Sequence, residues 1–198
     1  FDLRRSLETI RDIVSFLMRD AEDESDSPYP CLRQLAGDIM VFPQLISRIN
    51  AILSPYGKIK DNASAELSRI RRELQSTMSS ISRSLNNILR SAQSEGVVEK
   101  DVTPTLRDGR LVIPVAPALK RKIRGIVHDE SASGMTVCIE PAEVVEANNR
   151  IRELENEERR EIIRILTEFS IQLRPAIPDV LLSYEFLAQI DFIRAKAL

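Results

Sequence analysis

Aromatic residues and glycine are scarce in this chain of 198 residues. Phe, Tyr and Trp together make up 5% of the sequence, Trp is absent, and there are six glycines. Leu, Ile, Arg and Glu are abundant, which favours helices held by long apolar stripes over a compact core of aromatic rings. We therefore expect a mainly helical, elongated protein.

An excess of one charge is also missing, since the formal net charge is -2. No overall basic field draws the molecule to nucleic acid, so any such contact must come from a local patch. The two cysteines, Cys31 and Cys138, are too few for a disulfide framework. We interpret them as reduced, buried, small apolar residues in a reducing compartment.

The sequence has no apolar run of the roughly 20 residues that span a bilayer, and its start lacks the pattern of a signal peptide. We expect a cytoplasmic protein with no membrane partner. The first residue is Phe1 instead of Met, and the last residues belong to the amphipathic run LLSYEFLAQIDFIRAKAL. These two features suggest a segment of a longer polypeptide.

Motifs for catalysis are poorly represented. The six glycines never form the phosphate-binding pattern G-x-x-x-x-G-K-[ST], so we predict no nucleotide-binding residue. The run HDES at residues 128–131 combines an imidazole, two carboxylates and a hydroxyl. A triad depends on converging geometry, and a metal site needs more ligands than a lone histidine with nearby carboxylates. We interpret HDES as a turn that binds local backbone, and we predict no catalytic and no metal-binding residue.

Apolar residues recur at helical spacing through the first third of the chain. The pattern predicts a helix over residues 3–18 and shorter helices over residues 32–40 and 43–53. Between the first two, residues 21–30 are acidic and contain two prolines, which predicts an exposed loop.

Two longer helices are predicted over residues 64–95 and 142–173. Ser64 is a good N-cap for the first, and Pro141 suits the start of the second. After Leu67 and Ile70, apolar residues of the first alternate in steps of four and three, as in a coiled coil, at Leu74, Met78, Ile81, Leu85, Ile88 and Ala92. The seam of the second helix turns polar in its middle. We place the second seam at Val144, Asn148, Ile151, Glu155, Glu158, Ile162, Ile165 and Phe169. Equal lengths suit antiparallel partners.

The segment between these helices is far longer than a turn requires. Within it, LVIPV and MTVCI are rich in Val and Ile and are bounded by the turn signals Asp108-Gly109 and Ser133-Gly134. The stretch KIRGIVHDE alternates more weakly, and its Gly125 suits a bulge or a close backbone approach. The predicted fold is mainly α: a helical core with a long antiparallel helical hairpin that carries a small β subdomain of three or four strands at its tip.

Positive charge is concentrated in this β subdomain. Between residues 105 and 128, six basic residues stand against the single acid Asp108, and aromatic residues are absent. Lys and Arg pair with phosphates without reading base sequence, whereas stacking on single strands needs aromatic rings. The alternative is a solvated loop with ordinary surface charge. The candidate nucleic-acid-binding residues are Arg107, Arg110, Lys120, Arg121, Lys122 and Arg124.

Charges along the two long helices have a simpler interpretation. The run ENEERREIIR at residues 155–164 alternates in sign, as a solvated helix face with i,i+4 ion pairs does. We interpret Arg69, Arg71 and Arg72 in the same way, although basic residues on the helices can touch nucleic acid held at the tip.

Several motifs resemble the MutS family and, within it, the MutS-two subfamily. They are DVTPTLRDGRLVIPV, GIVHDESASGMTVCIEPAEVVEANN, the upstream DNAS and the terminal IDFIRAKAL, which occur in the subfamily's order. The resemblance extends over residues 59–198 and more loosely over the helices before them. In that family, two long lever helices leave a helical core, carry a small β clamp at their far end, and return to the core before an ATPase domain.

The resemblance implies a division into five parts. Residues 1–62 belong to the core, 63–98 form the outgoing lever, 99–141 the clamp, 142–175 the returning lever, and 176–198 a core helix that leads toward a missing ATPase domain. ATP and Mg²⁺ are expected only in that missing domain. The resemblance also implies a homodimeric parent with an Smr nuclease domain, linked to suppression of recombination through branched DNA and to rescue of collided ribosomes.

Three hypotheses about function follow. In the first, the segment binds branched or duplex DNA, or ribosomal RNA, through its clamp, while an ATPase elsewhere in the parent moves the levers. In the second, the hairpin transmits motion or docks on a partner protein and has no nucleic-acid binding of its own. In the third, the segment is itself an enzyme that depends on His128.

Overall fold

The computed structural model describes residues 1–19, 28–131 and 134–197 and contains two compact units. Unit 1 comprises residues 1–64 and 162–198, and unit 2 comprises residues 65–161. Helix α5 (Ala142–Leu173) contributes its first part to unit 2 and its last turns to unit 1. Each unit is described separately below.

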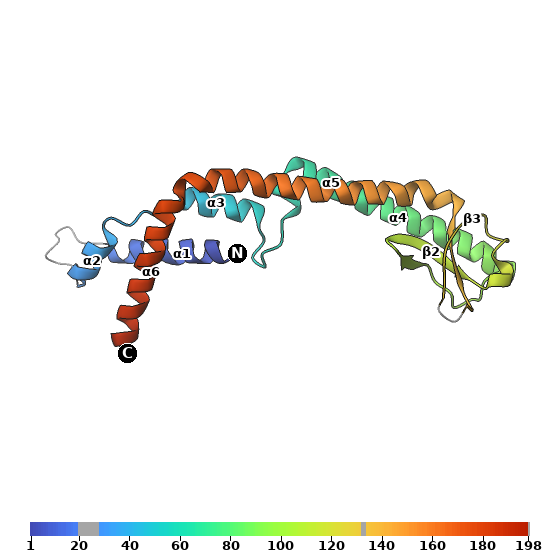
Figure 1. Cartoon of the computed structure of the whole chain (residues 1–198), viewed down its shortest axis with the longest axis horizontal. Coiled ribbons are helices and arrows are strands. Elements are labelled where there is room, and N and C mark those ends of the chain that lie inside the picture. Colours follow the sequence, from blue (N-terminus) through green and yellow to red (C-terminus); the bar gives the residue numbers. More distant parts are fainter. Residues whose placement is uncertain (20–27, 132–133, 198) are drawn as a thin grey trace. The chain divides into compact units, whose positions relative to one another are not determined.

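Unit 1 is built from helices. Besides the end of α5 they are α1 (Asp2–Leu17), α2 (Pro30–Ala36), α3 (Pro43–Ile52) and α6 (Ile177–Ala197), with 3₁₀ turns η2 (Asp61–Ala63) and η4 (Arg174–Ala176). Figure 1 labels these helices along the chain. Proline stands at the start of α2 and of α3, where its missing N–H costs no helical hydrogen bond. The helices predicted over residues 3–18 and 43–53 are confirmed to within a residue.

Two apolar clusters form the core of unit 1. The first consists of Leu7, Phe42, Ile46 and Val180. The second consists of Ile10, Leu17, Ala36 and Phe186. Leu7 and Ile10 are neighbours on α1 at a spacing of three residues, so one helix face serves both clusters, as the sequence pattern predicts.

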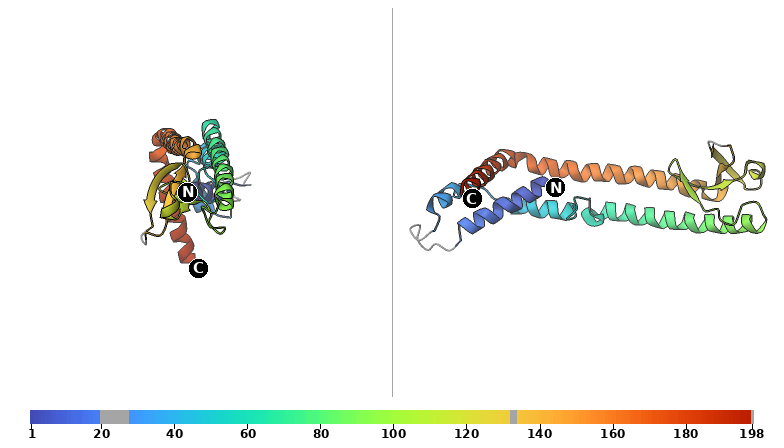
Figure 2. Two further views of the ribbon diagram at one scale, coloured as in Figure 1. Left: turned by 90° about the vertical axis from the view of Figure 1, so that its right-hand side faces the viewer. Right: turned by 90° about the horizontal axis from the view of Figure 1, so that it is seen from below.

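Unit 2 contains a pair of antiparallel helices. Helix α4 (Ala65–Ser94) runs beside the first part of α5, as Figures 1 and 2 both show. Ser64 precedes α4 with an extended backbone, as expected of an N-cap residue. The two predicted long helices are confirmed. The buried residues of α4 recur mostly in steps of three and four, and they are Leu67, Ile70, Ile81, Leu85, Leu89 and Ala92.

The seam between α4 and α5 differs from the prediction in its middle. On α4, Met78 stands at a predicted seam position and is 42% exposed. On α5, Leu154 is fully buried whereas Glu155 is exposed, and Glu161 is more buried than Ile162. The predicted seam was wrong by one residue there because it kept strict heptad spacing. At Leu154, burial of an apolar side chain is more favourable than burial of the neighbouring carboxylate. That reason does not apply to Glu161, which is buried next to an apolar residue.

Four antiparallel strands complete unit 2, in the order β1-β2-β4-β3. They are β1 (Thr105–Arg107), β2 (Arg110–Val115), β3 (Gly125–Glu130) and β4 (Val137–Pro141), with a 3₁₀ turn η3 (Pro117–Leu119) after β2. Strand β4 is buried along its whole length, whereas every residue of the edge strand β3 is exposed. The predicted mainly α fold with a small β subdomain is confirmed.

One apolar cluster joins the sheet to both helices. It includes Ile81, Leu85 and Leu89 of α4, Ile113 and Ile139 of the sheet, and Val144 and Ile151 of α5. A Cβ atom on Gly125 would lie 2.1 Å from the carbonyl oxygen of Glu140. Glycine is therefore required where β3 approaches β4, which confirms the close backbone approach expected at this position.

The predictions for the two cysteines, for the helix over residues 32–40 and for the acidic loop have mixed outcomes. Cys31 is exposed and not buried, whereas Cys138 on β4 is buried as expected. The helix predicted over residues 32–40 begins and ends earlier, as α2, because Pro30 opens it and Gly37 caps it. Most of the predicted acidic loop, namely its residues 21–27, lies outside the described residues. Across the three described ranges, no helix is long and apolar enough to cross a membrane.

Candidate nucleic-acid interface

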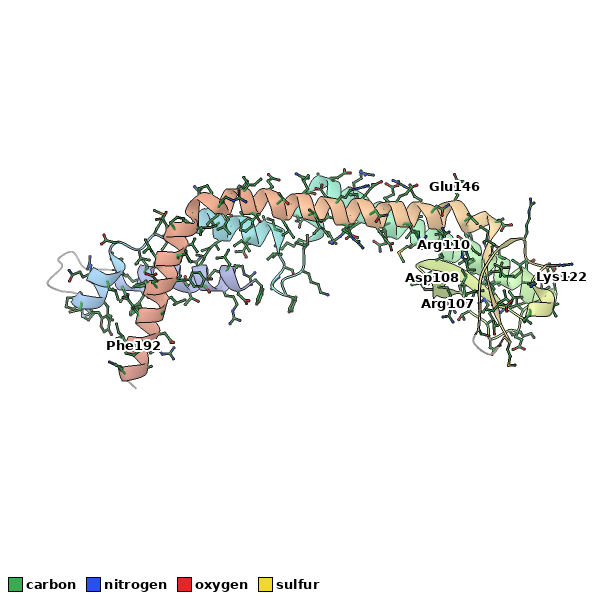
Figure 3. All side chains as sticks on the ribbon, in the orientation of Figure 1. Arg107, Asp108, Arg110, Lys122, Glu146 and Phe192 are labelled. Carbon is green, nitrogen blue, oxygen red and sulfur yellow. The ribbon has the colours of Figure 1, made fainter. Side chains whose placement is uncertain are left out.

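The six basic residues predicted to bind nucleic acid lie on two separate turns of unit 2. Arg107 and Arg110 flank the Asp108-Gly109 turn between β1 and β2. The other four, between η3 and β3, are Lys120, Arg121, Lys122 and Arg124. Figure 3 shows Arg107 and Arg110 at one side of the sheet and Lys122 at the other. The structure therefore does not bring the six together as one patch.

The turn between β1 and β2 is a two-residue hairpin turn. Asp108 and Gly109 both have positive φ, 48° and 74°, as a type I′ turn requires and as Asp-Gly favours. Arg152 of α5 donates a hydrogen bond of 2.9 Å to the Asp108 carbonyl oxygen. The turn is thus tied to α5, and Arg107 is exposed beside it.

Arg110 is bound within unit 2. Its Nη1 donates to Oε1 of Glu140 at 2.6 Å, and its Nη2 donates to Oδ1 of Asn149 at 2.7 Å. The Arg110 side chain is 15% exposed, and that of Glu140 is fully buried. Because both terminal nitrogens are engaged, Arg110 holds the sheet on α5, which leaves it little capacity to contact a phosphate.

Glu140 on β4 is the centre of a buried polar cluster. Besides Arg110, it accepts a hydrogen bond of 2.8 Å from Nδ2 of Asn148, on α5. The Asn148 carboxamide also accepts from the Leu111 amide and donates to the Leu111 carbonyl, both at 3.3 Å. Sequence reasoning missed this cluster, because nothing near Glu140 in the sequence marks it as buried.

His128, the single histidine of the chain, is the fourth member of this cluster. The pairing of β3 with β4 slips by one residue at His128, which makes it the extra residue of a β-bulge. Its Nε2 pairs with Oε2 of Glu140. The interpretation of HDES as a turn was therefore wrong for its first three residues, which lie in β3. Ser131 does bind local backbone, since its Oγ accepts a hydrogen bond of 3.0 Å from the Thr136 amide.

Two opposing effects set the pKa of Glu140. Burial raises the pKa of a carboxyl group, because the charged form loses its hydration. Hydrogen bonds from His128, Asn148 and Arg110 favour the charged form and prevail, so the pKa of Glu140 lies below its ordinary value. Glu140 is consequently ionised at neutral pH and binds its partners as a charged group.

The five remaining basic residues are available to an external ligand. All five are exposed, and the described part of the chain offers none of them an ion pair or a side-chain hydrogen bond: Arg107, Lys120, Arg121, Lys122 and Arg124. Lys122 and Arg124 line a small cavity together with Glu95 of the turn after α4 and Glu143 of α5. These two carboxylates weaken the positive potential on that side.

Charged pairs join the first third of α4 to α5. Arg71 donates to Glu158 at 2.7 Å, and Arg150 donates bonds of 2.9 and 2.8 Å to Glu73. The interpretation of Arg71 and of residues 155–164 as solvated faces was wrong for Arg71 and Glu158, which pair across the two helices. Opposite charges beside the seam of two antiparallel helices are the signal that predicts such pairs.

The chemistry that this arrangement supports is recognition of negative charge. Lys and Arg on exposed turns can contact phosphate oxygens, and such contacts position a protein without specifying base sequence. Within residues 1–19, 28–131 and 134–197, no group of three or more His, Cys, Asp or Glu side chains is placed to hold a metal ion.

Comparison with known proteins finds relatives that cover most of this chain. A protein named Endonuclease MutS2 from Finegoldia magna is 42% identical over 177 residues, which are 88% of this chain and 22% of the relative. Endonuclease MutS2 from Pelotomaculum thermopropionicum is 38% identical over 169 residues, 85% of this chain and 21% of the relative. Endonuclease MutS2 from Lacticaseibacillus paracasei is 38% identical over 195 residues, 98% of this chain and 24% of the relative. The chain thus spans less than a quarter of these relatives, and no family model matches it.

Proposed function

The chain is homologous to a segment of the proteins of the MutS2 family, and on that premise we propose that it is the part of such a protein that binds nucleic acid. In this proposal residues 99–141 are the clamp, residues 63–98 and 142–175 are the levers, and the remaining residues belong to the core. The clamp binds the phosphate backbone without regard to base sequence.

One observation carries the proposal: five exposed cations of the clamp lack a carboxylate partner among the described residues, in a chain whose net charge is -2. Each cation that neutralises a phosphate releases condensed counterions, which is the main source of non-specific affinity for nucleic acid. The absence of aromatic residues from residues 99–141 disfavours stacking on single strands. Duplex or branched DNA, or structured ribosomal RNA, fits these features best.

The proposal for the parent protein rests on homology alone. An ATPase domain outside this chain, with ATP and Mg²⁺, moves the levers in a homodimer, and the target is DNA in recombination or a stalled ribosome. The word endonuclease in the relatives' name refers to proteins of which this chain covers less than a quarter. We assign no nuclease activity to the segment itself.

Fluorescence anisotropy with a labelled four-way junction, a linear DNA duplex and a ribosomal RNA helix tests the proposal over a salt series. The test variant replaces four clamp cations with Gln, namely Lys120, Arg121, Lys122 and Arg124. The control variant replaces four exposed cations outside the clamp with Gln, namely Lys58, Arg159, Arg160 and Arg174.

We expect the clamp variant to bind more weakly and to flatten the dependence of log K on log salt. Each lost phosphate contact lowers that slope by about 0.9, so four contacts lower it by about 3.6. The control variant should keep most of the wild-type slope. Equal slopes for the two variants would remove the support for a clamp that binds phosphate.

A second candidate function is docking of the clamp on a partner protein. The observation that favours it is the edge strand β3, where Ile126 and Val127 are 47% and 48% exposed. An exposed edge strand offers unpaired backbone groups to an added strand. A partner retained by the chain through high salt and nuclease treatment would favour this function, whereas release of the partner by nuclease would favour the first.

A further inference from the structure

The charge on α4 is unevenly distributed along the helix. Between Glu73 and Glu95 there is no Asp or Glu, and the charged residues of this stretch are Arg83 and Arg90. Most other exposed residues of the stretch are Ser, Asn or Gln. A long part of α4 is therefore polar and carries positive charge only.

Three arginines of α4 lie on one face. Arg72, Arg83 and Arg90 are separated by 11 and 7 residues, which are close to three and two turns of an α-helix. Ile81 and Leu85 lie about half a turn from Arg83, on the side that joins the apolar cluster. We define the α4 outer face by its six exposed residues Arg72, Ser76, Ser79, Arg83, Asn86 and Arg90.

The guanidinium groups of the α4 outer face are not neutralised. Nε of Arg72 donates to the Ser68 carbonyl at 3.1 Å, and Nε of Arg83 donates to the Ser79 carbonyl at 3.4 Å. These bonds run along the helix and involve no carboxylate. Within the residues that the structure describes, Arg72, Arg83 and Arg90 form no ion pair.

Helix α5 offers no comparable face. Seven glutamates lie between residues 143 and 161, and the exposed Arg159 and Arg160 directly follow Glu157 and Glu158. Nearby carboxylates reduce the attraction of these cations for an anion. Arg159 and Arg160 are therefore a matched control for Arg83 and Arg90, with the same charge and with exposed side chains.

We propose that the α4 outer face binds the phosphodiester backbone of a double-stranded nucleic acid lying along the helix. The inference rests on the proposed function, to which it adds a second contact besides the clamp. Arg, Ser and Asn are side chains that contact phosphate and sugar oxygens. The distance from Arg72 to Arg90 is about 27 Å at 1.5 Å per residue, the length of about eight base pairs.

A duplex suits this face better than a single strand does. The α4 outer face contains no aromatic residue on which unpaired bases stack. Its positive groups are spread along a straight helix, so they match a charge that repeats along an axis and not a single compact anion.

The test compares two double variants of equal charge, Arg83→Gln with Arg90→Gln and, as the control, Arg159→Gln with Arg160→Gln. Gln has nearly the helix propensity of Arg, and all four side chains are exposed, so thermal unfolding should match the wild type in both. Anisotropy is measured over a salt series on a DNA duplex and an RNA duplex of about 30 base pairs, which is longer than the α4 outer face.

We expect the α4 variant to lower the slope of log K against log salt by about 1.8 on DNA, since two phosphate contacts are lost, and the α5 variant to change it little. The same decrease in slope on the RNA duplex would support one site for both backbones. A decrease on one duplex alone would support the site and show whether its ligand is DNA or RNA. Equal slopes for the two variants on both duplexes would overturn the inference.

The clamp variant distinguishes this failure from a failure of the proposed function. If the clamp variant binds more weakly while the α4 variant binds like its control, the clamp function stands and the α4 outer face is not a contact. If the wild-type chain binds neither duplex at low salt, the proposed function fails and the inference fails with it.

Discussion

The buried charges at the sheet of unit 2 and the charges between its helices differ in what surrounds them. Glu140 is fully buried and bound by three side chains, whereas Arg71 and Glu158 are each 26% exposed. A buried charge that loses a partner cannot be rehydrated, so the loss is costly. A partly exposed charge is solvated by water instead. The buried cluster around Glu140 therefore fixes the positions of the side chains that bind it, whereas the ion pair between the helices can be lost at little cost.

This difference bears on the proposed function. A clamp follows the motion of a lever only if the joint between them is rigid. The Glu140 cluster connects β2, β3 and β4 to α5 with directional bonds, which specify one orientation more strictly than apolar contact does. The pairs between the helices, by contrast, are open to screening by salt.

Glu140→Gln should have the largest effect on stability. The substitution keeps the shape of the side chain and leaves Arg110 and His128 without their anionic partner, at a cost of about 3 kcal/mol or more in the free energy of unfolding. Urea unfolding at neutral pH measures this. The control is Glu146→Gln, an exposed position on α5. A loss no larger than that of the control would contradict the role assigned to Glu140.

The stability due to Glu140 should also depend on pH. Because the pKa of Glu140 is lower in the folded protein, its contribution is complete above its unfolded pKa, about 4.3, and is lost as the pH falls through the folded pKa. The difference in unfolding free energy between wild type and Glu140→Gln should therefore shrink as the pH falls below about 4. A difference that grew in acid would refute the assignment.

Apolar residues beneath the sheet and between the helices provide a second test of how tightly the two regions are packed. Leu85 is fully buried in the cluster beneath the sheet, and Met78 is 42% exposed between the helices. We expect Leu85→Ala to lower the free energy of unfolding by about 2 to 3 kcal/mol and Met78→Ala by less than about 0.5 kcal/mol. Urea unfolding of both variants provides the measurement, and similar losses would mean that the middle of the helix pair is packed as tightly as its end.

A small effect is also expected for Glu158→Gln, which removes one partner of Arg71 between the helices. A partly exposed ion pair contributes below about 1 kcal/mol, and added salt should reduce that contribution further. Thermal unfolding at low and at high salt measures it. A loss that matched that of Glu140→Gln and persisted at high salt would erase the distinction between the two groups of charges.

Most of the fold was predictable because the signals are local. The spacing of Leu67, Ile70, Ile81 and Leu85 on α4 and the proline before α5 depend only on neighbouring residues, and they placed both long helices. The candidate site was predictable in part. Exposed cations on turns follow from composition, but the engagement of Arg110 does not, because its partners Glu140 and Asn149 lie 30 and 39 residues away.

The sequence by itself determined which segments become helix and strand, and that positive charge gathers in the segment between the long helices. Only the tertiary structure decided which charged residues are buried. It buried Glu140 and bound it to Arg110 and His128, turned Leu154 inward in place of Glu155, and left one face of α4 with arginines that have no ion pair among the described residues. The period of a helix or strand relates residues that are a few positions apart in the chain, whereas the burial of a charge depends on which distant elements pack around it.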